Sequence, residues 1–148
     1  MFLTLADLDV YYDSQYVSQW TSQTGFEAKF NAVCGYIDGI IRSKLKNTNW
    51  DINGELAKTG AERNEWLIGV FGNLVISELT SRFNLPQGEE LERQVSRRQE
   101  AMGILEDARE GRDSPNLDPL DKDGDGKPDG VGAVIFKSPA DNVDKTQP

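Results

Sequence analysis

Apolar residues recur every three or four positions along residues 26–45, and this spacing most constrains how the chain can fold. The repeating positions are Phe26, Phe30, Val33, Cys34, Ile37, Ile40, Ile41 and Leu45. Such a repeat places its members on one face of an α-helix, so the sequence predicts a helix from about residue 25 to residue 45. Cys34 falls within the stripe, which indicates a small buried apolar residue and not a reactive thiol.

Two glycines, Gly35 and Gly39, also belong to this predicted helix. At that spacing they lie on the same part of the helix surface and leave room for a neighbouring helix to approach closely. We expect this close contact to lie within the domain.

A second long apolar pattern begins near residue 60 or 61 and continues to about residue 83. It predicts the most buried helix of the chain, because apolar residues occupy a wide part of its circumference. Asn84-Leu-Pro86 ends this helix, since a residue that precedes proline disfavours helical geometry.

The N-terminal region predicts shorter helices. Thr4 can cap a helix over residues 5–12, in which the Asp7 carboxylate can reach back to free backbone N–H groups. A further short helical turn carries Tyr16, Val17 and Trp20, which we interpret as packing residues.

Residues 47–59 are rich in Asn and Gly, and this composition predicts a surface loop. Within it, Trp50 and Ile52 are candidates to pack back against the domain as anchors.

The helix predicted over residues 89–109 differs from the others because it is strongly charged. Its few apolar positions are Leu91, Val95, Met102, Ile104, Leu105 and Ala108. Arg93, Arg97 and Arg98 lie among glutamates, so we expect ion pairs at i,i+4 spacing. Two interpretations remain: a solvated outer helix with surface ion pairs, or a charged subunit interface formed by these arginines.

After Gly111 the apolar repeat ends, and Asp, Gly, Pro and Lys dominate. One short apolar run follows, Val131-Gly-Ala-Val-Ile-Phe136, and it predicts a lone β-strand or an extended docking segment. A single strand cannot satisfy its own backbone donors, so this run must pair with another element. Its partner-binding candidates are Val131, Val134, Ile135 and Phe136.

These patterns together predict a mainly α fold. Residues 1–112 form a four-helix-bundle-like domain, and residues 113–148 form an extended acidic C-terminal arm that contains one short β-strand.

The arm also contains the opening of a calcium-binding loop. Asp121, Asp123, Asp125 and Asp129 have the spacing of EF-hand loop positions 1, 3, 5 and 9. Gly132 stands where a bidentate glutamate is needed, and the flanking residues do not predict helices. The match is closer to the acidic loops of thrombospondin type-3-like repeats. A weak Ca²⁺ site and a simple acidic turn both fit this sequence.

Composition excludes several functional classes. The chain has no histidine and one cysteine, so it has no Ser-His-Asp triad, no His-ligated zinc and no thiolate cluster. A formal net charge of -9 is poorly suited to gripping nucleic acid. No apolar run is long enough to span a bilayer, and the N-terminus lacks the pattern of a secretory signal. We therefore predict neither an enzyme nor a membrane protein.

As a whole, the chain resembles the small helical head–tail adaptor (connector) proteins of tailed bacteriophages, in particular the phage Mu-type family. The resemblance rests on the MFLTLADL opening, the stripe over residues 26–45, the apolar segment Arg63 to Arg82, and the Pro86 loop before the charged helix. That helix closes with Leu105-Glu-Asp-Ala-Arg-Glu-Gly-Arg112, and Pro115-Asn-Leu117 follows. The long loop at residues 47–59 and the acidic arm depart from the simplest members of the family.

The resemblance implies a structural virion protein of the neck, assembled in the host cytoplasm, with no active-site residues. Such proteins form a homo-oligomeric ring, typically a dodecamer, that binds the portal protein and supports stopper or tail-completion proteins. DNA passes through the ring without sequence-specific binding, and a negatively charged lining would favour that passage. The alternative hypothesis is a calcium-responsive helical binding module that uses the acidic loop at residues 121–129.

Overall fold

The computed structural model describes residues 1–12, 14–82, 88–121 and 124. This part of the chain is mainly helical, as the sequence predicts, and contains no strand. The elements are α1 (Leu5–Tyr11), α2 (Ser14–Thr21), α3 (Phe26–Leu45), α4 (Ile52–Ala57), a 3₁₀ turn (Gly60–Glu62), α5 (Glu65–Arg82) and α6 (Glu89–Arg109). The predicted strand at residues 131–136 lies outside the described residues.

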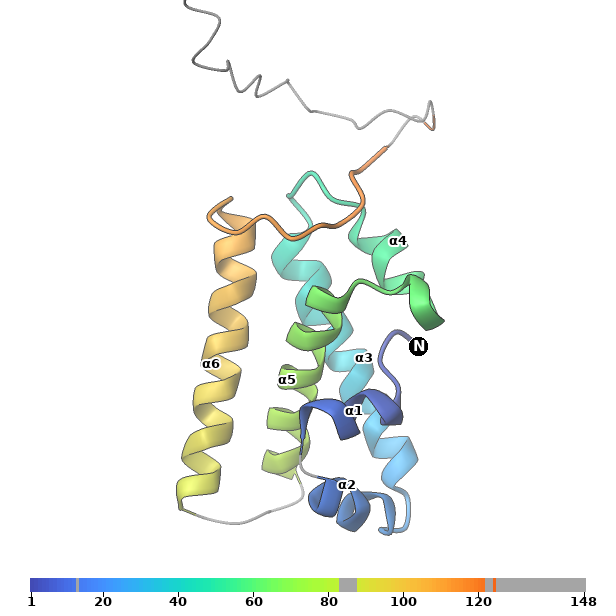
Figure 1. Ribbon diagram of the computed structural model, residues 1–148, viewed down its shortest axis with the longest axis vertical. Coiled ribbons are helices and arrows are strands. Elements are labelled where there is room, and N and C mark those ends of the chain that lie inside the picture. The colour runs from blue at the N-terminus through green and yellow to red at the C-terminus, as the bar shows by residue number, and fades with distance from the viewer. Residues whose placement is uncertain (13, 83–87, 122–123, 125–148) are drawn as a thin grey trace, which may run out of the picture.

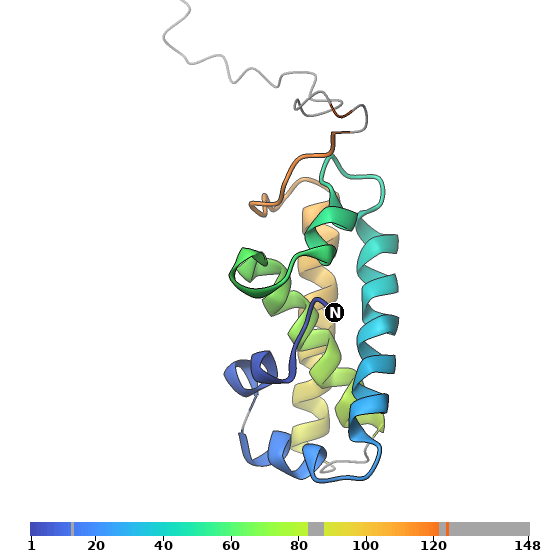
Figure 2. The ribbon, with the colours of Figure 1, turned by 90° about the vertical axis from the view of Figure 1, so that its right-hand side faces the viewer.

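Helix α5 forms the centre of the molecule and packs against α1, α3 and α6. Figure 2 shows it between α1 on one side and the long, straight α3 on the other. Its buried residues are Leu67, Val70, Phe71, Gly72, Leu74, Val75, Ile76, Ser77, Leu79 and Thr80. These positions surround most of the helix circumference, which confirms α5 as the most buried helix and explains why three elements must cover it.

Helix α3 buries the face that the sequence predicts. The buried residues are Phe26, Phe30, Val33, Cys34, Ile37, Ile41 and Leu45, while Ile40 is only partly buried. Burial raises the pKa of the Cys34 thiol to about 12, so the thiol stays protonated and unreactive near neutral pH.

Helix α6 packs on α5 through a narrower face made of Gln94, Ala101, Leu105 and Ala108. The Ser77 hydroxyl of α5 donates a buried hydrogen bond of 3.1 Å to the backbone carbonyl oxygen of Gln94. Small and polar residues therefore fill much of this contact, which lets the two helices lie close together.

Of the two short N-terminal helices, α2 lies at the lower end of the molecule in Figure 1, and α1 lies above it. The Asp7 carboxylate accepts a hydrogen bond of 2.6 Å from the Thr4 backbone N–H, which confirms the predicted reach back to the helix start. The Tyr12 and Trp20 rings stack with centroids 5.1 Å apart, and Trp20 is fully buried, as expected for a packing residue.

The Asp7 carboxylate also joins α1 to the segment before α5. The Arg63 guanidinium donates to both Asp7 oxygens, at 2.6 and 3.0 Å, and to the Phe2 carbonyl at 2.7 Å. Both side chains of this ion pair are mostly buried, so solvent screens it less than a surface pair. The pair fixes the N-terminal segment against the core.

The prediction of a simple loop over residues 47–59 is wrong in one respect, because α4 forms within it. The Asp51 carboxylate caps this helix by accepting a hydrogen bond of 2.9 Å from the Gly54 N–H. A Cβ at Gly54 would clash with the Asp51 carboxylate, so any other residue there would displace the capping side chain. Ile52 is buried and Trp50 packs on the core, as predicted for anchors.

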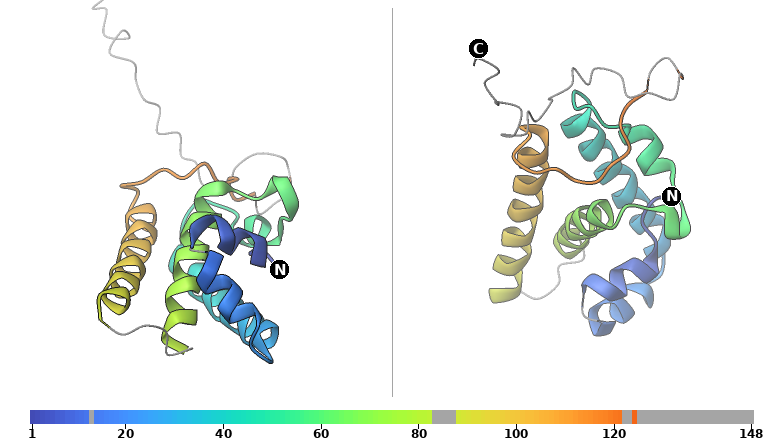
Figure 3. Two further views of the ribbon diagram at one scale, coloured as in Figure 1. Left: turned by 60° about the horizontal axis from the view of Figure 1, so that its bottom comes forward. Right: turned by 45° about the horizontal axis from the view of Figure 1, so that its top comes forward.

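After α6 the chain crosses the end of the helices and reaches the loop before α4 (Figure 3). There Leu117 is buried in the core, and Trp50 and Pro119 form an antiparallel β-bridge. The Leu120 N–H donates to the Asn49 carbonyl at 2.8 Å, and the buried Glu55 carboxylate accepts from the Asp118 N–H at 2.7 Å. The first part of the predicted arm is thus bonded to the helical domain.

The Asp7–Arg63 pair makes stability depend on pH. Burial raises the pKa of the Asp7 carboxyl, but hydrogen bonds from Arg63 and Thr4 outweigh it and hold the pKa below its usual value of 3.8. The stabilisation is therefore fully present above about pH 4 and is lost as pH falls through the lowered pKa. We expect Asp7→Asn to reduce the free energy of unfolding by about 1–3 kcal/mol at pH 7.

Urea denaturation of the wild type and the variant at pH 7 and at pH 3 checks this prediction. The difference between them should shrink at the lower pH. Asp9→Asn, which changes an exposed carboxylate on the same helix, is the matched control and should have little effect at either pH. An equal loss of stability at both pH values would show that the ionised pair is not the cause.

Candidate interaction surfaces

The candidate functional features of the described residues are two surfaces. No group of three or more His, Cys, Asp or Glu residues in this part of the chain is arranged to hold a metal ion. Its cysteine is buried and protonated. The candidate sites are therefore a groove and an exposed apolar patch.

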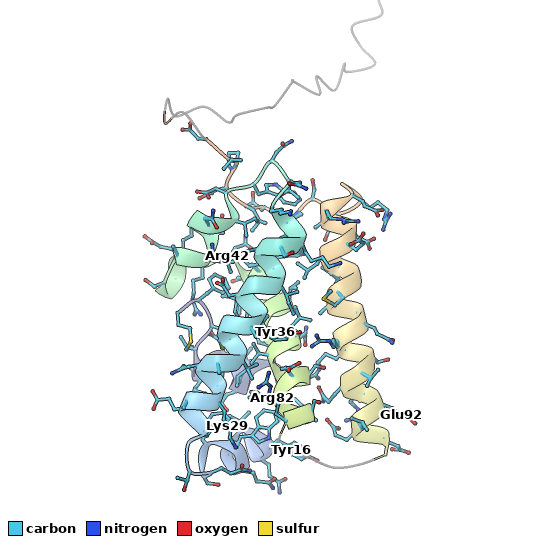
Figure 4. All side chains as sticks on the ribbon, turned by 180° about the vertical axis from the view of Figure 1, so that it is seen from behind. Tyr16, Lys29, Tyr36, Arg42, Arg82 and Glu92 are labelled. Atoms are coloured by element: carbon cyan, nitrogen blue, oxygen red, sulfur yellow. The ribbon has the colours of Figure 1, made fainter. Side chains whose placement is uncertain are left out.

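The first candidate is a groove of about 590 Å³ between α3 and α6, here called the α3–α6 groove. It is lined by Gly35, Tyr36, Gly39, Ile40, Ser43, Lys44, Arg98 and Met102. Figure 4 shows these two helices side by side, with Tyr36 at the side of α3 that faces α6. Its volume lies in the range of grooves that hold apolar groups.

Two glycines line this groove, and their surroundings differ from the sequence prediction. Gly35 and Gly39 were expected to make a tight contact within the domain, but a Cβ built on either would meet no atom within 4 Å. No helix of the described chain uses the space that they leave. Tyr36, between them, is 49% exposed.

Charged residues rim the groove on the α6 side and at its upper end. Lys44 lies 3.6 Å from the Glu106 carboxylate, and Arg98 lies 3.2 Å from the Glu78 carboxylate of α5. These pairs join α3 to α6 and α6 to α5 across the groove margins. The margins of the apolar groove therefore carry two basic side chains, Lys44 and Arg98, and each is held in place by an ion pair with a carboxylate.

The second candidate is an apolar surface on the first half of α6, here called the α6 patch and defined by Leu91 and Val95. These side chains are 46% and 49% exposed, although they are two of the apolar positions of the predicted helix. They line a hollow of about 300 Å³ together with Ser77, Glu78, Ser81, Gln94, Arg98 and Gln99. Large apolar side chains exposed at i,i+4 spacing are typical of a helix face that docks on a partner.

The structure places the three predicted interface arginines in different surroundings. Arg93 is mostly exposed and pairs with Glu90 at 3.2 Å, while Arg98 pairs with Glu78 on α5. Arg97 is partly buried, with its guanidinium 5.3 Å from the centre of the Tyr12 ring. The observed spacing is i,i+3 or between helices, not the expected i,i+4. Arg98 lines the same hollow as the α6 patch, whereas Arg93 lies on the opposite side of the helix and Arg97 packs inward.

The predicted calcium loop is described only at its start. The Asp121 carboxylate accepts a hydrogen bond of 2.8 Å from the Gly124 N–H, and Gly124 has a φ of 70° that favours glycine. Asp123, Asp125 and Asp129 lie outside the described residues, as do the arm residues Val131, Val134, Ile135 and Phe136. Calcium binding therefore stays a prediction.

A comparison of the chain with protein-family models, with curated proteins and with solved structures found no match. Among the described residues, no helix combines the length and apolar character needed to cross a membrane. The two surfaces and the sequence are therefore the features from which a function can be inferred.

The contrasting surroundings of the arginines lead to a prediction about stability. We expect Arg97→Ala to lower the free energy of unfolding by about 1 kcal/mol, because it removes a cation–π contact and the cover over the Tyr12 ring. Arg93→Ala, the matched control on the same helix, should change it by less than about 0.5 kcal/mol. Chemical denaturation measures both. Equal effects would contradict the inward packing of Arg97.

Proposed function

We propose that this chain is a structural adaptor subunit at the neck of a tailed-bacteriophage particle. Copies of the chain form a ring, typically a dodecamer, that binds the portal protein and links the capsid to stopper or tail-completion proteins. DNA passes through this ring. The proposal assigns the chain no catalytic role and requires no cofactor.

The observation that carries the proposal is the α6 patch. Leu91 and Val95 expose large apolar surfaces on α6, and neither belongs to the buried core or to the apolar residues packed against it. Exposing them to water is unfavourable, and burial against another protein removes that cost. Arg98, which lines the same hollow, supplies a charge that can fix the register of a protein contact. This combination supports a role in assembly.

The charge and the arm also support this role. A net charge of -9 disfavours tight binding of DNA, which suits a protein through which DNA must move. The apolar run at residues 131–136 can add a strand to an exposed sheet edge on a neighbouring protein. The resemblance of the sequence to head–tail adaptors favours the portal and the stopper or tail proteins as those neighbours.

Electron microscopy of purified particles, or of the chain mixed with portal protein, tests the proposal directly. We expect a ring of this protein at the portal vertex. The isolated chain can be monomeric and form the ring only on the portal. A chain that is absent from particles and does not associate with portals would refute the adaptor role.

A single substitution tests whether the α6 patch is a subunit contact. Val95→Glu places a charge in a contact that must exclude water, so we expect assembly to fall at least about tenfold while the monomer stays folded. Val10→Glu is the matched control, because Val10 is 76% exposed on α1, away from the patch. Sedimentation of portal mixtures measures assembly, and circular dichroism checks folding. Unchanged assembly of Val95→Glu would exclude the patch as the contact.

The alternative function, a calcium-responsive binding module, rests on the spacing of Asp121, Asp123, Asp125 and Asp129, of which the structure describes only the turn in which Asp121 accepts from the Gly124 N–H. Calorimetric titration with CaCl₂ separates the two hypotheses. Binding heat that is lost in Asp123→Ala and Asp125→Ala, together with calcium-dependent partner binding, would support the alternative. The adaptor proposal expects assembly without calcium.

A further inference from the structure

The α3–α6 groove adjoins the α6 patch, and Arg98 lines both, but its apolar lining consists of different residues. Its interior exposes Tyr36, and Ile40 and Met102 are only partly buried there. The absence of side chains at Gly35 and Gly39 lets another peptide backbone approach α3 closely. The groove is therefore shaped for a short apolar segment.

The chain itself contains such a segment. Residues 131–136 are the apolar run of a region otherwise dominated by Asp, Gly, Pro and Lys. The groove is an apolar surface without an occupant among the described residues, and the run is an apolar segment that needs a partner. Docking of the run in the groove would remove the apolar surfaces of both from water.

The position where the chain leaves the domain makes this docking possible within one molecule. Leu120 is hydrogen-bonded to Asn49, a few residues after the C-terminal end of α3. The segment from Leu120 to Phe136 can span up to about 50 Å when extended. Helix α3 has 20 residues and is therefore about 30 Å long, so the run can reach every part of the groove.

The charges along this path are only weakly complementary. Lys44 and Arg98 line the groove, although each is already paired with a carboxylate, and the connecting segment carries Asp123, Asp125 and Asp129 but also Lys122 and Lys127. The net negative charge of the connection adds only a weak attraction to this margin, while the apolar run enters the interior. The tether therefore does most to favour the same chain over an unrelated apolar peptide.

We propose that residues 131–136 occupy the α3–α6 groove of their own chain when the protein is unassembled. The run is then withheld from other proteins until a partner competes for it, which makes the contact autoinhibitory. This docking does not depend on the adaptor role, because it concerns the isolated chain.

Disulfide trapping in the full-length chain tests the docking. Gly39→Cys places a thiol in the groove, where a new Cβ has open space, and Val134→Cys places its partner in the run. Under mild oxidation we expect an intramolecular disulfide in most of the molecules. The matched control pairs Val134→Cys with Gly103→Cys, which also has open space but lies on α6 outside the groove lining, and it should form at least about tenfold less. Cys34 is buried with a raised pKa and will not compete.

Two results would overturn the proposal. One is cross-linking through Gly39→Cys no greater than through Gly103→Cys. The other is a disulfide-linked dimer as the main product, which would show that the run docks on a second copy.

Hydrogen exchange gives a second test without cysteines. In the wild-type chain, we expect the amides of residues 131–136 to exchange more slowly than those of an unstructured peptide. Gly39→Trp fills the groove and should return them to the unprotected rate, whereas Gly103→Trp should not. Unprotected amides in the wild-type chain would contradict the docking.

Discussion

Burial of α5 on most of its circumference determines where every other long helix can lie. A helix with apolar residues on one stripe needs one neighbour, but α5 carries buried residues from Leu67 to Thr80 on several faces. Helices α1, α3 and α6 each cover one of those faces. The hydrophobic contribution of this arrangement is large, because a fully buried Leu, Ile or Phe side chain contributes about 1.5–3 kcal/mol. The remaining contacts, such as Asp7 with Arg63, fix the ends of elements that α5 has already positioned.

Both candidate surfaces follow from the same constraint. Because α3 and α6 are each directed toward α5, they share only a margin with one another, and side chains missing at Gly35 and Gly39 widen that margin into the α3–α6 groove. Helix α6 meets α5 through a face centred on Gln94, Ala101 and Leu105, so Leu91 and Val95 fall beside that face and remain exposed. Neither residue belongs to the core cluster of the described residues. Surfaces that the core does not need are the ones available for association.

The long helices could be predicted from the sequence because their apolar spacing is strong. Residues 89–109 match α6, and the buried face of α3 contains the predicted stripe apart from the partly buried Ile40. Helix α4 was missed because it is short and its signal is a single cap, Asp51 with Gly54. Whether another helix packs against Gly35 and Gly39 was not predictable, since glycines at this spacing allow a close helix contact but do not require one. The spacing of Leu91 and Val95 was a signal for a shared apolar face, but telling an exposed face from a core face requires knowing which side of the helix α5 occupies.

We propose that the α6 patch becomes buried when copies of the chain assemble. The most direct measurement is the rate of maleimide labelling of Val95→Cys in the isolated chain and in the complex assembled with portal protein, each normalised to Val10→Cys. We expect the thiol at position 95 to react readily in the isolated chain, where Val95 is 49% exposed, and at least about tenfold more slowly in the assembly. Equal labelling rates in the two states would contradict the claim.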